Sequence, residues 1–192
     1  VLAPAGSGGV GTVGIQPAKH LGAHVATAVG TANVELARAL GADEVIDYRR
    51  EEFDQRLSGF DVVLHTLDAA VLDRSVKVLK PGGQIISISG PPDPAFAAEV
   101  GANWIVRQVL RLASAKIRRK ARRAGIDYSF LFMRPDGGQL AEIARLVDAG
   151  VIHPVIDQTF TFADTAAALD RSASGRARGK VLIRVAPDGA AA

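Results

Sequence analysis

The sequence predicts an α/β fold of the doubly wound type, in which helices cover both faces of a parallel sheet of about six strands. Three observations predict it. Apolar strand segments alternate with helical segments over the first 90 residues, as parallel βαβ units require. A glycine-rich turn at residues 6–11 joins the first strand to the first helix. The chain has 192 residues, 48% of them hydrophobic, which is enough for one core.

The glycine-rich turn reads Gly6-Ser7-Gly8-Gly9-Val10-Gly11 and matches the pattern G-x-G-x-x-G. An apolar strand precedes it, a helical run to His20 follows, and residues 25–29 form the next apolar strand. In this pattern the glycines allow a tight turn, a close approach to a pyrophosphate, and close packing of helix against strand. The N-terminus of the helix attracts phosphate. The pattern therefore predicts a dinucleotide-binding Rossmann unit; an incidental glycine-rich turn is the alternative.

The elements up to residue 89 continue the alternation. We expect helices over 33–40, 51–57 and 70–79, and strands over 44–48, 60–66 and 84–89. The run Val62-Val63-Leu64 suits a sheet that is covered on both faces. Pro81-Gly82-Gly83 ends the helix before it, because neither residue type continues a helix.

After Ser89 the pattern changes. A basic helical insertion is predicted over about 94–125, then a strand over 128–133, a helix over 139–148 and an extended segment over 155–162. A helix over 164–172 and a strand over 180–185 complete a domain of residues 1–185. We expect the tail, residues 186–192, to be frayed.

The insertion carries eight cations and no acidic residue between Val100 and Ile126. The cations are Arg107, Arg111, Lys116, Arg118, Arg119, Lys120, Arg122 and Arg123. Apolar residues recur at helical spacing at Ile105, Val109, Leu112, Ala113 and Ile117. We expect a solvated helix over the domain edge, with Trp104 as a core anchor and arginine stems covering apolar surface. A place near the cofactor phosphate is one alternative; contact with a membrane or nucleic acid is another, which we do not expect.

The end of the second strand decides between the two nicotinamide cofactors. An acidic residue there binds the ribose 2′-hydroxyl and repels a 2′-phosphate. This chain has Gly30-Thr31-Ala32-Asn33 and no carboxylate before Glu35, which favours NADP(H) over NAD(H). Thr31 and Asn33 offer hydrogen bonds to the phosphate, and Tyr48 and Arg49 follow the next strand. The alternative for Tyr48 is an aromatic at a strand end with its hydroxyl in water.

Several other kinds of site are not expected. The chain has no cysteine, which excludes disulfides, thiolate zinc ligands and a catalytic thiol. The four histidines are scattered, so we expect no metal site. Ser7 lacks the G-x-S-x-G pattern of a nucleophile elbow, and neither tyrosine has a lysine four residues on. No segment matches a membrane span or a secretory signal, so we expect a cytoplasmic location.

Four segments together resemble a known family in their order and spacing. They are the turn at residues 6–11, Leu40-Gly41-Ala42-Asp43 with Val45-Ile46-Asp47-Tyr48, Val78-Leu79-Lys80-Pro81-Gly82-Gly83, and Gly175-Arg176-Ala177-Arg178-Gly179-Lys180-Val181. The chain resembles the medium-chain dehydrogenase/reductases, in the zinc-independent NADPH:quinone oxidoreductase-like branch. The resemblance covers nearly the whole chain.

The resemblance implies two parts, a GroES-like catalytic domain followed by a Rossmann domain. This chain resembles the Rossmann part alone, so we expect the catalytic domain to be missing from it. The family's cofactor contacts fall on Gly8, Gly9, Val10, Thr31, Tyr48, Thr66, Leu67, Ser89, Gly90, Phe130, Phe132 and Lys180. Asp68 stands where relatives often have glycine, and we expect its charge to affect cofactor affinity. The resemblance also implies a homodimer that pairs through the sheet edge.

These observations lead to one expected function and one alternative. The expected function is an NADPH-binding domain of an oxidoreductase that transfers a hydride to a quinone, an enone or a similar electron-poor double bond. In such enzymes the protein orients the cofactor, which carries the chemistry. No catalytic residue is assigned, and the isolated chain is expected to be inactive. The alternative is a nucleotide-binding or sensing module without catalysis of its own.

Overall fold

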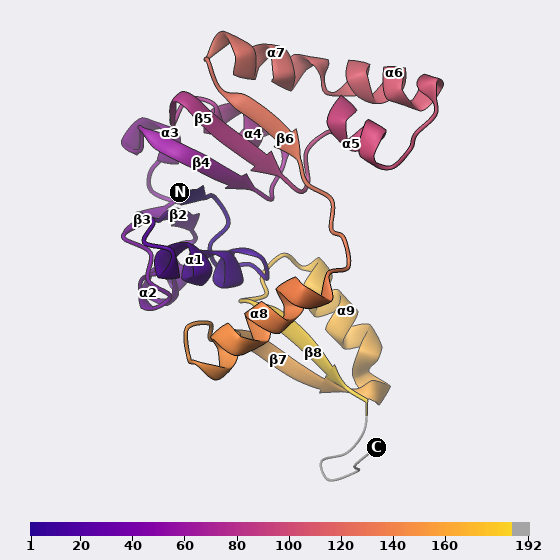
Figure 1. Ribbon diagram of the computed structural model, residues 1–192. Helices are drawn as coiled ribbons and strands as arrows, with labels where there is room; N and C mark the ends of the chain where they lie inside the picture. Colours follow the sequence, from indigo (N-terminus) through magenta and orange to yellow (C-terminus); the bar gives the residue numbers. More distant parts are fainter. Residues whose placement is uncertain (186–192) are drawn as a thin grey trace.

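A six-stranded parallel sheet forms the centre of the computed structural model, which describes residues 1–185 (Figure 1). The strands stand in the order β3-β2-β1-β4-β5-β6. They are β1 (Leu2–Ala3), β2 (Ala26–Val29), β3 (Glu44–Asp47), β4 (Phe60–His65), β5 (Leu79–Ser87) and β6 (Asp127–Phe130). This order confirms the doubly wound fold, and it reverses between β1 and β4, where such sheets open a crevice for ligands.

Helices connect these strands near the positions that the sequence predicts, except that the helix expected over 70–79 ends at Ser75 and Pro81-Gly82-Gly83 lies inside the next strand and does not end the helix. They are α1 (Gly11–His20), α2 (Val34–Ala39), α3 (Phe53–Arg56) and α4 (Ala69–Ser75), with a 3-10 turn, η1 (Thr31–Asn33), before α2. Helix α1 continues through Pro17. The core lies around the sheet: Leu2, Val63 and Ile85 are fully buried.

The predicted insertion forms three helices, α5 (Pro94–Glu99), α6 (Trp104–Ala113) and α7 (Ala115–Arg123). Helix α7 lies along the sheet, and its Ile117 and Ala121 belong to the core (Figure 1). Helix α6 extends past the sheet and has no buried residue. The expectation that Trp104 anchors the core is therefore wrong, because its side chain is 73% exposed.

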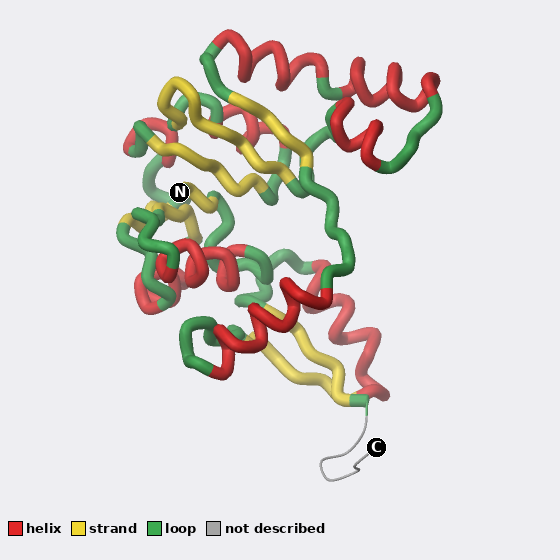
Figure 2. The backbone as a smooth tube through the Cα atoms, viewed as in Figure 1, coloured by secondary structure: helices red, strands yellow, loops and turns green. Residues whose placement is uncertain are grey.

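The last part of the described chain forms a smaller unit beyond a connecting loop (Figure 2). It contains α8 (Gly137–Asp148), β7 (Ile156–Thr161), a 3-10 turn, η2 (Phe162–Asp164), α9 (Thr165–Ala173) and β8 (Lys180–Arg184). Strands β7 and β8 pair in parallel with each other, and neither joins the six-stranded sheet. The tail predicted to fray lies outside the described residues. No helix within residues 1–185 combines the length and apolar character of a membrane span.

Candidate functional site

The glycine-rich turn leads directly from β1 into the N-terminus of α1. A Cβ atom on Gly6 would lie 2.1 Å from Oγ1 of Thr27, and one on Gly11 would lie 2.0 Å from the carbonyl oxygen of Ala5. Only glycine fits at these two positions. No side chain caps α1, and its first turn has no acidic residue. The N–H of Thr12 donates to the carbonyl oxygen of Gly8 at 3.0 Å, so the helix offers its remaining first-turn N–H groups and the positive end of its dipole to an anion, as a pyrophosphate site requires.

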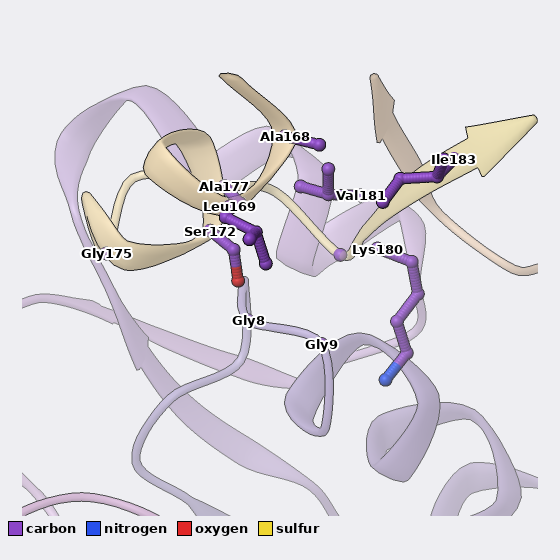
Figure 3. A pocket seen from close by; sticks show the side chains of 11 residues that line it. Gly8, Gly9, Ala168, Leu169, Ser172, Gly175, Ala177, Lys180, Val181 and Ile183 are labelled. Atoms are coloured by element: carbon purple, nitrogen blue, oxygen red, sulfur yellow. The ribbon is translucent and has the colours of Figure 1, made fainter. Parts of the chain in front are cut away.

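Lys180 brings a positive charge to the same turn from the other end of the chain. Its side chain points toward Gly9 (Figure 3), and its Nζ lies 3.1 Å from the position that a Cβ on Gly9 would occupy. A pocket of about 480 Å³ opens here between the glycine-rich turn, α9 and β8. The backbone joins the two segments, since the N–H of Gly179 donates to the carbonyl oxygen of Ser7 at 2.9 Å.

The loop before Lys180 is held by Asp157. Nε and Nη2 of Arg171 donate to its carboxylate at 2.7 and 2.9 Å, and the N–H of Arg178 donates at 3.0 Å. These hydrogen bonds lower the pKa of Asp157 to about 2, and those from the Arg171 side chain have the largest effect. Asp157 is therefore ionised at neutral pH and fixes the loop that carries Arg176, Arg178 and Lys180.

A second hollow, of about 240 Å³, lies beside the end of β2 and is rich in arginine. Its lining residues are Ser7, Gly30, Thr31, Ala32, Asn33, Tyr48, Arg49, Gly175, Arg176, Ala177 and Arg178. A Cβ on Gly30 would lie 3.1 Å from the hydroxyl of Tyr48 and 3.6 Å from Nε of Arg49. Within residues 1–185 no carboxylate forms an ion pair with the side chains of Arg49, Arg176 or Arg178. The hollow therefore presents positive charge without a direct ion pair, although Asp47 and Asp157 lie near enough to interact electrostatically with Arg49 and Arg178.

The structure assigns a different partner to the Thr31 hydroxyl than the sequence suggests. This hydroxyl donates to Oδ2 of Asp47 at 2.6 Å, which lowers the pKa of Asp47. The hydroxyl proton of Thr31 is thus directed at a carboxylate. Oδ1 of Asn33 is buried and has no hydrogen-bond partner among the described residues. It is an acceptor placed to receive a donor such as a ribose hydroxyl.

A third hollow, of about 440 Å³, is mainly apolar and lies between the ends of β1 and β4. Pro4, Ala28, Phe53, Leu67 and Val71 are among the residues that line it. An apolar slot of this kind suits a planar aromatic ring. All three hollows are lined by Gly175 and Ala177 and by the glycine-rich turn, so they form parts of one crevice.

The residues predicted for the nicotinamide end lie at the carboxyl ends of β4, β5 and β6. The hydroxyl of Ser89 donates to the carbonyl oxygen of Leu67 at 2.7 Å, which links the loops after β4 and β5. Phe130 and Phe132 pack on Phe96, with ring centroids 5.1 and 5.7 Å apart. Of the predicted set Thr66, Leu67, Ser89, Gly90, Phe130 and Phe132, only Leu67 lines one of the three hollows. The structure thus brings these residues to one sheet end without joining them to the crevice.

Two residues behind this end have roles that the sequence did not show. His65 is fully buried; its Nδ1 lies 2.9 Å from Oγ of Ser87, and its Nε2 lies 3.0 Å from the carbonyl oxygen of Asp68. Burial lowers the pKa of His65. The carboxylate of Asp68 accepts from the N–H groups of Ala70 and Val71 and so caps α4. Asp68 is therefore committed to the helix that follows it.

Sequence reasoning also missed Arg176 and Arg178 as site residues. The only signal was their place in the segment Gly175-Arg176-Ala177-Arg178, which is distant in sequence from the glycine-rich turn. Tertiary contacts bring the two segments together. Within residues 1–185 no cluster of three or more His, Asp or Glu side chains could hold a metal ion.

Comparisons with known proteins agree with this geometry. The sequence profile of a family described as "Zinc-binding dehydrogenase" matches residues 40–183. The chain belongs to this family. The match confirms the resemblance to the medium-chain dehydrogenase/reductases and their quinone oxidoreductase-like branch.

Two relatives and one solved structure illustrate the similarity. The "NAD(P)H oxidoreductase RTN4IP1, mitochondrial" of Danio rerio is 31% identical over 98% of this chain and 49% of its own length. The "NADPH-dependent alkenal/one oxidoreductase, chloroplastic" of Arabidopsis thaliana is 28% identical over 97% of the chain and 41% of its length. The quinone oxidoreductase of Coxiella burnetii shares the fold with a TM-score of 0.80 and 24% identity, covering 96% of this chain and 52% of that one. The chain thus spans about half the length of such relatives.

Proposed function

We propose that this chain binds NADPH and forms the cofactor-binding part of an oxidoreductase that reduces a quinone, an enone or a similar electron-poor double bond. The observation that supports NADPH most directly is the hollow lined by Arg49, Arg176 and Arg178. Three arginines that form no direct ion pair with a carboxylate suit the 2′-phosphate that distinguishes NADPH from NADH. Names of relatives that specify NAD(P)H and NADPH support a nicotinamide cofactor.

Each part of the crevice fits one part of the cofactor. The glycine-rich turn and the N-terminus of α1 would hold the pyrophosphate, with Lys180 adding charge. The apolar slot beside Leu67 would hold the adenine. Tyr48 and the three arginines would hold the 2′-phosphate, and Oδ1 of Asn33 would accept from the ribose. The hydroxyl of Thr31 donates to Asp47. Thr31 would therefore position the Asp47 carboxylate and would not bind the phosphate directly.

When bound, NADPH supplies the hydride. The described residues would bind and orient it, since the crevice lies at the carboxyl end of the sheet. The nicotinamide half would extend from the crevice toward the loops after β5 and β6. We assign no acid or base to this chain. A GroES-like domain outside it would supply the groups that orient the substrate, without zinc. Pairing through the edge strand β6 would form a homodimer. We also propose a cytoplasmic location for the protein.

The test is a calorimetric titration of the chain with NADPH and NADH at matched salt. NADPH is expected to bind more tightly than NADH. Replacing both loop arginines, Arg176→Gln with Arg178→Gln, should weaken NADPH binding by roughly 10–100-fold, since hydrogen bonds to charged groups are lost, and leave NADH unchanged. Arg145→Gln, an exposed arginine on α8, is the control. Equal affinity for both cofactors in the unchanged chain would contradict the preference.

A second measurement separates the enzyme from the module without catalysis. The chain joined to its expected catalytic domain should oxidise NADPH in the presence of a quinone or an enone. Tight NADPH binding without oxidation by any such acceptor would favour the nucleotide-binding module instead.

A further inference from the structure

Two charged side chains line the mainly apolar hollow between the ends of β1 and β4. Glu52 stands directly before α3, and Arg74 lies on α4. The residues with polar side chains in the lining of this hollow are Ser7, Tyr48, Glu52 and Arg74. Ser7 and Tyr48 also line the arginine-rich hollow beside β2, whereas Glu52 and Arg74 do not. Glu52 and Arg74 are therefore the polar groups that remain for the base once the ribose and its phosphate occupy the arginine-rich hollow.

The guanidinium group of Arg74 is fixed by three neighbours. Its Nε donates to Oδ1 of Asp54 at 2.7 Å, and its Nη2 pairs with Oε2 of Glu52. Its central carbon lies 4.5 Å from the centre of the Phe53 ring, which also lines the hollow. A planar guanidinium held in this way keeps its donors in a defined orientation.

The carboxylate of Glu52 is not used by the helix that follows it. Glu52 occupies the N-cap position of α3, but its side chain makes no capping hydrogen bond. The ion pair with Arg74 uses Oε2, and a carboxylate has further lone pairs for another donor. The charge of Arg74 also balances the carboxylate, so a cofactor with several phosphates is not repelled from the hollow. The pair thus offers an acceptor beside a set of donors.

We infer, on the basis of the proposed NADPH binding, that Glu52 and Arg74 make this hollow selective for adenine. Adenine carries a donor, its 6-amino group, beside an acceptor, its N1 atom. Glu52 accepts from the amino group, and Arg74 donates to N1. Hypoxanthine has the same shape but carries a carbonyl oxygen in place of the amino group and an N–H at N1, so both of its groups meet the wrong partner. The apolar lining alone would accept either base.

Calorimetric titration of the full chain with NADPH and with its hypoxanthine analogue tests this selectivity. The two compounds share the 2′-phosphate and the nicotinamide, so only the base differs. The analogue is expected to bind about tenfold more weakly, a moderate loss because the side chains of Glu52 and Arg74 are 52% and 31% exposed. Glu52→Gln should reduce the difference to less than about threefold, because an amide can turn its NH₂ group toward the carbonyl oxygen. Asp54 still holds Arg74 in this variant.

Glu51→Gln is the matched control. Glu51 also pairs with an arginine, Arg56, at 3.2 Å, but it does not line the hollow, so this variant should keep the tenfold difference. Equal affinity of the unchanged chain for both compounds would overturn the selection of adenine and leave NADPH binding intact. A tenfold difference that persists in Glu52→Gln would overturn the role of Glu52. Binding of neither compound would overturn the selectivity together with the proposed function.

Discussion

The six-stranded sheet and the two-stranded sheet both have parallel strands, but they differ in how much of their apolar surface is covered. Strands β1, β4 and β5 place Leu2, Val63 and Ile85 in a fully buried core. In the smaller unit Ile156 on β7 is 45% exposed and Leu182 on β8 is 42% exposed. Helix α8 has no buried residue. The first sheet is stabilised by its own packing, whereas the second has too little buried apolar surface to be independent.

Polar contacts with the larger unit hold the smaller one in place. The side chain of Gln16 on α1 donates to the carbonyl oxygen of His153 at 3.1 Å and accepts from its N–H at 2.7 Å. Gly179 is bound to Ser7 through the backbone. The crevice lies along this junction, so residues of the weaker unit complete a site that the stronger unit begins. Binding and the attachment of β7 and β8 are therefore expected to be coupled.

The largest contrast is expected from matched truncations in the two sheets. Ile85→Ala removes a fully buried side chain from β5 and should lower the free energy of unfolding by about 2–5 kcal/mol. Ile183→Ala on β8, where the side chain is 37% exposed, should lower it by roughly 0.5 kcal/mol. Urea denaturation measures both. Equal losses would show that the second sheet has a core of its own.

Gly179→Ala should detach the smaller unit selectively. Gly179 has φ of +77°, and a Cβ there would lie 2.2 Å from the carbonyl oxygen of Val155. The expected cost is about 1–3 kcal/mol, with faster amide hydrogen exchange in residues 150–185 and unchanged exchange in β1–β6. Gly175→Ala is the control, because it has φ of +65° but no atom within 4 Å of the added Cβ. Uniform loss of protection across both sheets would contradict the separation.

Gln16→Ala tests the polar connection itself. It removes both hydrogen bonds to His153 and should cost about 1–3 kcal/mol. It should also weaken NADPH binding, because the loop at residues 175–180 loses support. Thermal unfolding and calorimetry measure the two effects. Gln55→Ala on α3, which alters an exposed glutamine, should change neither the stability nor the affinity for NADPH. Equal losses in the two variants would show that the hydrogen bonds of Gln16 to His153 have no special role.

The smallest effect is a pH dependence that belongs to the six-stranded sheet. Burial lowers the pKa of His65 from its ordinary 6.5, so the unfolded chain binds a proton more readily than the folded one. Stability from this residue is therefore complete above about pH 6.5 and falls as the pH drops below it. His65→Gln should make the urea midpoint less dependent on pH as the pH falls from neutrality to below about 6.5. An unchanged profile would mean that His65 does not titrate on unfolding.

Local sequence patterns predicted the larger unit well. The glycine-rich turn, the alternation of strands and helices up to Ser89, and the helical character of the insertion follow from spacing and turn residues, which act over a few neighbours. The same patterns brought Gly8, Gly9, Thr31 and Tyr48 to the list of site residues, and the family resemblance added Lys180; all five line the crevice. Periodicity could not show which apolar faces stay covered, so Trp104 was assigned to the core.

The sequence by itself determined the doubly wound fold and the place of the phosphate-binding turn, because both depend on short-range backbone geometry. Only the tertiary structure decided that Arg176 and Arg178 line the same hollow as Gly30, that the Thr31 hydroxyl is bound to Asp47, and that β7 and β8 form a separate sheet. Those outcomes depend on contacts between segments far apart in the chain. Their energies come from packing and hydrogen bonds that exist only once the chain has folded.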